Sequence, residues 1–159
     1  MNYWLFKSEP ATFSIDDLAK APKKTTMWDG VRNFQARNML RDGISKGDEG
    51  FFYHSNGEPA GIAGIVRIVR PGYPDPTAFN PRHAHYDPPA KNGKGSRDDP
   101  QWYAVDVQLA RKFKRIITLD ELRGHYAGKL AGLLILRPGN RLSVTPVAAD
   151  DWKFIVNLE

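Results

Sequence analysis

A bent β-hairpin around Asn56 and Gly57 is the feature that most restricts how this sequence can fold. Two apolar runs, 50–54 and 61–69, flank a short polar connection whose Asn-Gly pair readily takes positive φ angles. Glycines at positions 61 and 64 of the second run predict a tightly curved strand, as at the corner of a small barrel where another backbone approaches closely. The hairpin therefore favours a curved sheet.

The remaining predicted elements are short and irregularly spaced. Residues 71–100 hold seven of the 12 prolines and predict a long irregular excursion. Strands are expected at 3–7, 101–113 and 141–144, and helices at 14–18, 31–43, 118–121 and 150–158, with Gly43 ending the second helix in a left-handed conformation. Regular helices do not separate the strands, so we do not expect a doubly wound fold. We expect one α+β domain, residues 1–159, around a small, curved, mainly antiparallel sheet.

Composition narrows the classes of partner and compartment. The 23 lysines and arginines exceed the 18 acids, which gives a net charge of +5 and a pI near 9.5 and favours encounter with a polyanion. The absence of cysteine excludes disulfides, thiolate nucleophiles and cysteine-ligated metals. Neither an export leader nor a run of about 18 apolar residues is found. We expect a soluble, cytoplasmic protein that does not contact membranes.

Polar and aromatic residues cluster at the ends of the apolar runs. Side chains at such positions are held by a rigid scaffold yet reach solvent, and planar rings, amides, hydroxyls and cations together suit a base inside a pocket. The clusters are Lys7-Ser8-Glu9-Pro10, Trp28-Asp29-Gly30-Val31-Arg32-Asn33, Phe52-Tyr53-His54-Ser55-Asn56 and Arg141-Leu142-Ser143-Val144-Thr145-Pro146.

Taken with Tyr73-Pro74-Asp75-Pro76-Thr77, these clusters resemble the EVE domain family, which includes the thymocyte nuclear protein group and belongs to the PUA-like superfamily. The resemblance runs from the first strand to the last helix. It implies a PUA-like β-pseudobarrel flanked by short helices. It also implies a pocket that reads a flipped, modified base in DNA or RNA.

Reading an extruded base requires a ring to stack on and polar groups to pair with its edge. Trp28 is the candidate stacking surface, although it is equally well explained as a core tryptophan. Asn33 offers an amide that either reads the base edge or caps the following helix. Ser143 and Arg141 share one side of the last predicted strand, so that a hydroxyl and a guanidinium converge on a ligand.

The other candidates carry alternatives of the same kind. Tyr53 and Ser55 share one strand face and His54 takes the other, so all three enter one pocket only if the strand kinks at Asn-Gly; the family resemblance favours this kink. The pocket edge and the backbone of the nucleic acid are assigned to five charged residues, Lys7, Glu9, Arg32, Arg37 and Arg141. Exposed ion pairs and a solvated helix face are the alternatives for these charges.

Metal and catalytic functions find less support. His83, His85 and Asp87 form a His-x-His-x-Asp pattern that would ligate a metal from an extended segment, but a proline-flanked loop is a poor preformed site, and we expect no metal or other cofactor. An enzyme acting on RNA or a nucleotide would use His54 or His83 with Lys7. A protein interaction module would expose a broad apolar patch. A non-catalytic reader of a modified base is the preferred hypothesis.

Overall fold

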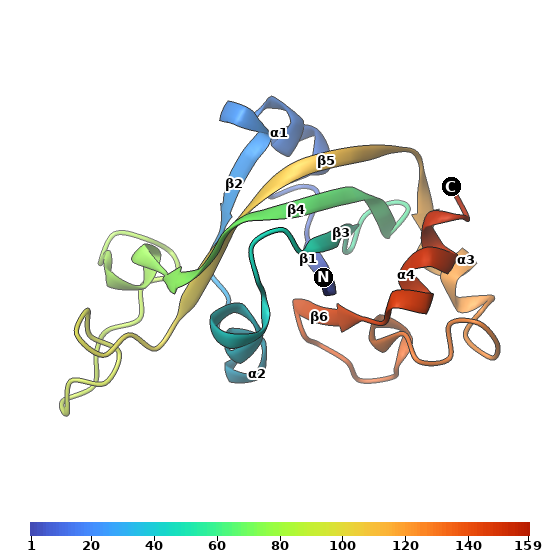
Figure 1. Cartoon of the computed structure of the whole chain (residues 1–159). Coiled ribbons are helices and arrows are strands. Elements are labelled where there is room, and N and C mark those ends of the chain that lie inside the picture. The colour runs from blue at the N-terminus through green and yellow to red at the C-terminus, as the bar shows by residue number, and fades with distance from the viewer.

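Six β-strands form one open, strongly curved sheet in the computed structural model, which describes residues 1–159 (Figure 1). The strands lie in the order β2-β5-β4-β3-β1-β6, and only the β1 and β3 pair is parallel. The strands are β1 (Tyr3–Ser8), β2 (Thr25–Trp28), β3 (Glu49–His54), β4 (Gly61–Pro74), β5 (Tyr103–Thr118) and β6 (Val144–Val147). The α-helices are α1 (Ile15–Lys20), α2 (Phe34–Asn38), α3 (Leu119–Arg123) and α4 (Ala149–Val156). The predicted α+β class with a mainly antiparallel curved sheet is confirmed.

The predicted hairpin is formed by β3 and β4, and β4 curves strongly. Asn56 takes a φ of 56° in the connection. The register between β4 and β5 shifts at four places, which bends both strands. A Cβ at Gly64 would lie 2.4 Å from the carbonyl oxygen of Arg111 on β5. The prediction that another backbone approaches this strand closely is therefore confirmed.

Alternation along the strands gives the sheet two apolar faces. Trp4 and Phe6 of β1 belong to one buried cluster, whereas Leu5 between them belongs to the other. The first cluster is covered by α1 and α2, and the second by α3 and α4, which lie together at one end of the molecule (Figure 1). Short helices thus flank both faces, as the family resemblance implied.

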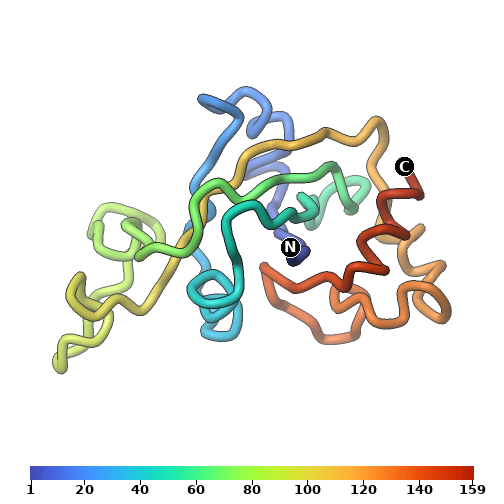
Figure 2. The backbone as a smooth tube through the Cα atoms, viewed as in Figure 1, coloured from blue at the N-terminus to red at the C-terminus, as the bar shows by residue number.

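The excursion between β4 and β5 leaves the sheet, and returns to it, at the end of the molecule opposite α3 and α4 (Figure 2). The amide of Asp75 donates to the carbonyl of Trp102 at 2.9 Å and closes its base. Its first turn is a 3-10 helix, Pro76–Phe79, and turns and bends follow. The predicted irregular excursion is confirmed, except that β4 continues to Pro74.

Several element boundaries differ from the sequence-based expectation. The helix predicted at 31–43 begins only at Phe34, and its last turn is a π-helix, Met39–Gly43, which ends without a left-handed glycine. The last strand begins at Val144, because Asn140 accepts the amide of Leu142 and holds a turn before it. Strand β2 was not predicted. No helix has both the length and the apolar composition needed to cross a membrane.

Candidate functional site

A pocket of about 630 Å³ brings together three of the predicted polar clusters and part of the excursion. Its volume lies within the range typical of small-molecule sites, roughly 300 to 1,000 Å³. The walls come from the end of β1 (7–9), the segment after it (12–13), β2 and its following turn (26–31), His83, His85 and Ser143. Of the predicted site residues, Lys7, Glu9, Trp28 and Ser143 line this pocket. Their role in binding a base stays a prediction.

Trp28 forms part of the pocket wall while most of its indole belongs to the core. Its exposed fraction is 8%, and its ring makes edge contacts with Phe6 and Phe52 at centroid distances of 5.3 and 5.6 Å. The core interpretation of Trp28 is confirmed, and its role as a stacking surface stays a prediction. Phe13, which was not predicted, also lines the pocket and is only partly buried, so it offers a second ring for stacking.

Asp75 anchors the turn that follows Trp28. Its fully buried carboxylate accepts the amide of Gly30 and the guanidinium of Arg32, both at 2.9 Å, and the amide and hydroxyl of Thr77 at 2.8 and 2.6 Å. Burial by itself raises the pKa of Asp75, but the hydrogen bonds from Thr77, Gly30 and Arg32 outweigh it and lower the pKa. The carboxylate therefore stays ionised and fixes the backbone beside the pocket.

Arg32 connects this anchor to the excursion. One guanidinium nitrogen bonds Asp75, and the other donates to the carbonyl of His85 at 2.7 Å. Arg37 similarly donates to the carbonyl of Gln101 at 2.6 Å. Neither arginine lines the pocket, because both are engaged in holding the excursion against α2. The phosphate contacts expected of them are thus not supported by their positions.

Four predicted site residues do not line the pocket: Asn33, Tyr53, His54 and Ser55. The Asn33 side chain caps α2 by accepting the amide of Ala36 at 3.0 Å, which is the alternative role for this amide. Tyr53 lies in the cluster beneath α3 and α4, on the opposite face of the sheet. Nε2 of His54 accepts the amide of Ile15 at 3.1 Å at the start of α1, and burial lowers its pKa. The register of β3 shifts between Phe52 and Tyr53, but this irregularity does not bring these side chains into the pocket.

Lys7 is the cation of the pocket. Its backbone amide donates to the carbonyl of Ser143 at 2.9 Å, which places the two residues side by side. No carboxylate forms an ion pair with Lys7, and partial burial lowers the pKa of its amine. Glu9 at the exposed edge accepts from Asn56 at 3.3 Å, and Arg141 is exposed without an ion-pair partner. An unpaired cation at a pocket is available to an anionic ligand.

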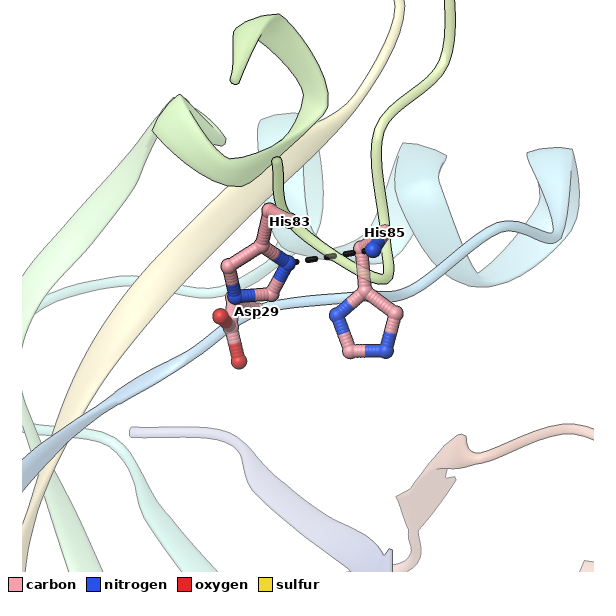
Figure 3. Close-up of side chains that lie close together, drawn as sticks. All are labelled: Asp29, His83 and His85. Carbon is pink, nitrogen blue, oxygen red and sulfur yellow. Dashed lines mark hydrogen bonds between the residues drawn. The ribbon is translucent and has the colours of Figure 1, made fainter. Parts of the chain in front are cut away.

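Asp29, His83 and His85 form a cluster that the sequence pattern did not identify (Figure 3). One ligand-type atom from each residue lies within 4.8 Å of the others. Asp87, the third residue of the His-x-His-x-Asp pattern, accepts the indole N–H of Trp102 at 2.5 Å. The His-x-His-x-Asp pattern fails because the segment turns: the amide of His85 donates to Nδ1 of His83 at 3.0 Å (Figure 3).

A second hollow, of about 580 Å³, lies between β2 and the end of β4. Its polar groups are largely engaged with one another. The Tyr73 hydroxyl donates to Asp106 at 2.5 Å, and burial together with this bond raises the pKa of Tyr73. Arg70 lies 3.7 Å from the centre of the same ring. The first pocket leaves more polar groups free for a ligand.

Comparisons with known proteins agree with the fold. The chain is 46% identical to mouse thymocyte nuclear protein 1, with 99% of this chain and 74% of that protein covered. A crystal structure of a Pseudomonas putida protein superposes with a TM-score of 0.89 at 46% identity, covering 98% of each chain. Human THYN1 in complex with DNA containing 5-methylcytosine gives a TM-score of 0.90 at 43% identity, covering 99% of this chain and 97% of that one. The model of the EVE domain matches residues 2–158, and the chain belongs to the EVE domain family.

Proposed function

We propose that this protein is a non-catalytic nucleic-acid-binding module whose 630 Å³ pocket holds a modified base extruded from its strand, with 5-methylcytosine in DNA as the first ligand to test. The observation that carries the proposal is the pocket itself, in a chain 43% identical to a protein crystallised with such DNA. Extruding a base costs a few kcal/mol of unstacking energy, which contacts between the base and the pocket have to offset.

The chemistry of the pocket supports this proposal. Stacking on an aromatic ring contributes about 1 to 3 kcal/mol per base, and Trp28 and Phe13 are the rings available. Lys7 provides an unpaired cation for a flanking phosphate. The net charge of +5 favours encounter with the polyanion. Each of these terms acts on binding, and none of them requires a chemical step.

The test compares duplexes that differ by one methyl group. Fluorescence anisotropy with a single 5-methylcytosine or cytosine at the same position should show tighter binding of the methylated duplex. Ser143→Phe fills the pocket and should abolish this preference while leaving salt-dependent binding in place. Ser45→Phe, at an exposed serine outside the pocket, is the matched control and should retain the preference.

Two outcomes would count against the reader. Equal affinity of the wild-type protein for both duplexes removes the claim that the modification is read. If the preference survives Ser143→Phe but is lost in Ser45→Phe, the modified base binds outside this pocket. RNA carrying 5-methylcytosine belongs in the same titration, because tighter binding of RNA would replace DNA as the partner.

A further inference from the structure

Asp29 and His83 both line the pocket, and their side chains lie next to each other (Figure 3). Their closest ligand-type atoms lie within 4.8 Å, yet the two side chains form neither an ion pair nor a hydrogen bond. No other group of the protein donates to the Asp29 carboxylate, which is half-buried. The pocket thus presents a free acceptor beside a ring nitrogen, with room for a ligand atom between them.

The backbone fixes which nitrogen of His83 carries its proton. The amide of His85 donates to Nδ1 of His83 at 3.0 Å, so Nδ1 acts as the acceptor. A neutral imidazole whose Nδ1 accepts carries its hydrogen on Nε2. In Figure 3 the Nε2 side of the ring is the side that faces Asp29. The pocket lining therefore offers a hydrogen-bond donor, His83 Nε2–H, next to an acceptor, the Asp29 carboxylate.

We infer that Asp29 and His83 together read the amino group and the adjacent ring nitrogen of a base, so that the pocket selects cytosine-type bases over thymine or uracil; this inference rests on the proposed function. Cytosine presents an N4 amino donor next to the N3 acceptor. Thymine presents the O4 acceptor next to an N3–H donor, which is the opposite pattern. A carboxylate cannot donate to O4, and the His83 N–H would confront the N3–H of thymine.

The same hydrogen bond argues against a resident metal at this cluster. A histidine that ligates a metal through Nε2 carries its hydrogen on Nδ1 and donates it outward, commonly to a carbonyl or carboxylate. Here Nδ1 of His83 already receives an N–H. Ligation through either nitrogen would require the His85 amide to lose its partner. The geometry suits an array of hydrogen bonds better than a coordination sphere.

Asp29 and His83, the reading pair, are held in position by contacts of the neighbouring backbone. Arg32 donates to the carbonyl of His85 and pairs with Asp75, which in turn holds Gly30 next to Asp29. The His85 ring lies against Gly30, where a Cβ would come within 2.4 Å of it. Gly30 has a φ of 74°, a conformation open to glycine. The donor and the acceptor are thus positioned from two distant segments by the same contacts.

The test compares 5-methylcytosine with thymine, which share the ring methyl group and differ only at position 4 and N3. Each base is placed opposite an abasic site, so that no base pair has to be broken before extrusion. The wild-type protein should bind 5-methylcytosine about 5- to 150-fold more tightly than thymine, the discrimination that one well-placed pair of hydrogen bonds supplies. Asp29→Asn can donate to O4 of thymine as well as accept and should lower the ratio severalfold, while the unfavourable contact between the His83 N–H and the N3–H of thymine remains.

Controls separate this inference from the proposed function. Asp98→Asn makes the same substitution at an exposed site of the excursion and should leave the ratio unchanged. If the wild-type protein prefers 5-methylcytosine to cytosine but Asp29→Asn keeps the full ratio against thymine, the reading pair is wrong and the reader stands. If the wild-type protein shows neither preference, the proposed function fails. Micromolar zinc binding that is lost in His83→Phe would overturn the assignment of Nε2 as a donor.

Discussion

Replacing Asp75 by asparagine should destabilise the protein strongly, because its buried carboxylate accepts four hydrogen bonds. Each carboxylate oxygen receives two donors: one accepts from Gly30 and Arg32, and the other accepts the amide and hydroxyl of Thr77. The asparagine NH₂ would face one of these pairs of donors, and the Arg32 charge would lose its partner. Breaking a buried ion pair by removing one side costs about 3 to 5 kcal/mol.

The structure places the expected loss at the lower end of this range. Asp75 has no exposed surface, but 23% of the Arg32 side chain is exposed, so water can partly solvate the orphaned guanidinium. We expect the free energy of unfolding to fall by about 3 kcal/mol, measured by urea denaturation with far-UV circular dichroism at pH 7. Asp98→Asn, an exposed aspartate of the excursion, should change it by less than about 0.5 kcal/mol.

The pH dependence provides an independent check on Asp75. Its hydrogen bonds lower the folded-state pKa below the ordinary value of 3.8, so its contribution to stability is complete above that value and is lost as the pH falls through the folded pKa. The wild-type protein should therefore lose stability steeply below about pH 4, and Asp75→Asn should lose less over the same interval. A loss under 1 kcal/mol at pH 7, or identical acid profiles, would refute the anchor role.

Three further predictions concern the hairpin and the pocket. Burial lowers the pKa of His54, which accepts the Ile15 amide, so as the pH falls the unfolded chain takes up a proton before the folded one does. The melting temperature should therefore fall as the pH drops below about 6.5. His54→Gln should remove this step in thermal melts from pH 7.5 to 4.5. Gly64→Ala should cost at least about 1 to 3 kcal/mol in urea denaturation, because its Cβ would lie 2.4 Å from a β5 carbonyl oxygen, whereas Gly128→Ala, with no atom closer than 3.9 Å, should be tolerated. Lys7→Met should weaken DNA binding and reduce the slope of log affinity against log salt by about 1; an unchanged slope would exclude a phosphate contact.

Local chemistry predicted the parts of the fold that depend on neighbouring residues. The Asn-Gly connection specified the β3–β4 hairpin, and Gly64 indicated the bend, since both features are imposed by backbone sterics. Ser14 accepts the amide of Asp17 and caps α1, the helix that the sequence predicted at 14–18. Strand β2 escaped prediction because Thr25–Trp28 is too short for an alternation to register and gains its partner only from β5.

The candidate site was predicted only where chain direction alone decides the outcome. Lys7 and Ser143 meet because β1 and β6 are antiparallel neighbours, so that the end of β1 lies beside the start of β6 at the pocket. The role of Asn33 was ambiguous because a side-chain amide that can pair with a base can equally cap a helix. In the structure the Asn33 side chain accepts the backbone N–H of Ala36 and caps α2. The proximity of Asp29 to His83 follows from the path of the excursion, whose sequence has no hydrophobic periodicity. The sequence pattern therefore does not predict which distant residues a long loop will contact.

Charged residues in this protein divide into those that hold the pocket and those that remain available to a ligand. Arg32 and Asp75 are chemically as suitable for phosphate or base contacts as Lys7 and Asp29, but they satisfy each other within the fold. Lys7 and Asp29 form no ion pair and line the pocket, so their interactions await a partner from outside. Because a group already hydrogen-bonded gains little by exchanging one partner for another, binding energy should come from the free members. Substituting a holding residue should thus lower stability and binding together, whereas substituting a free one should change binding alone.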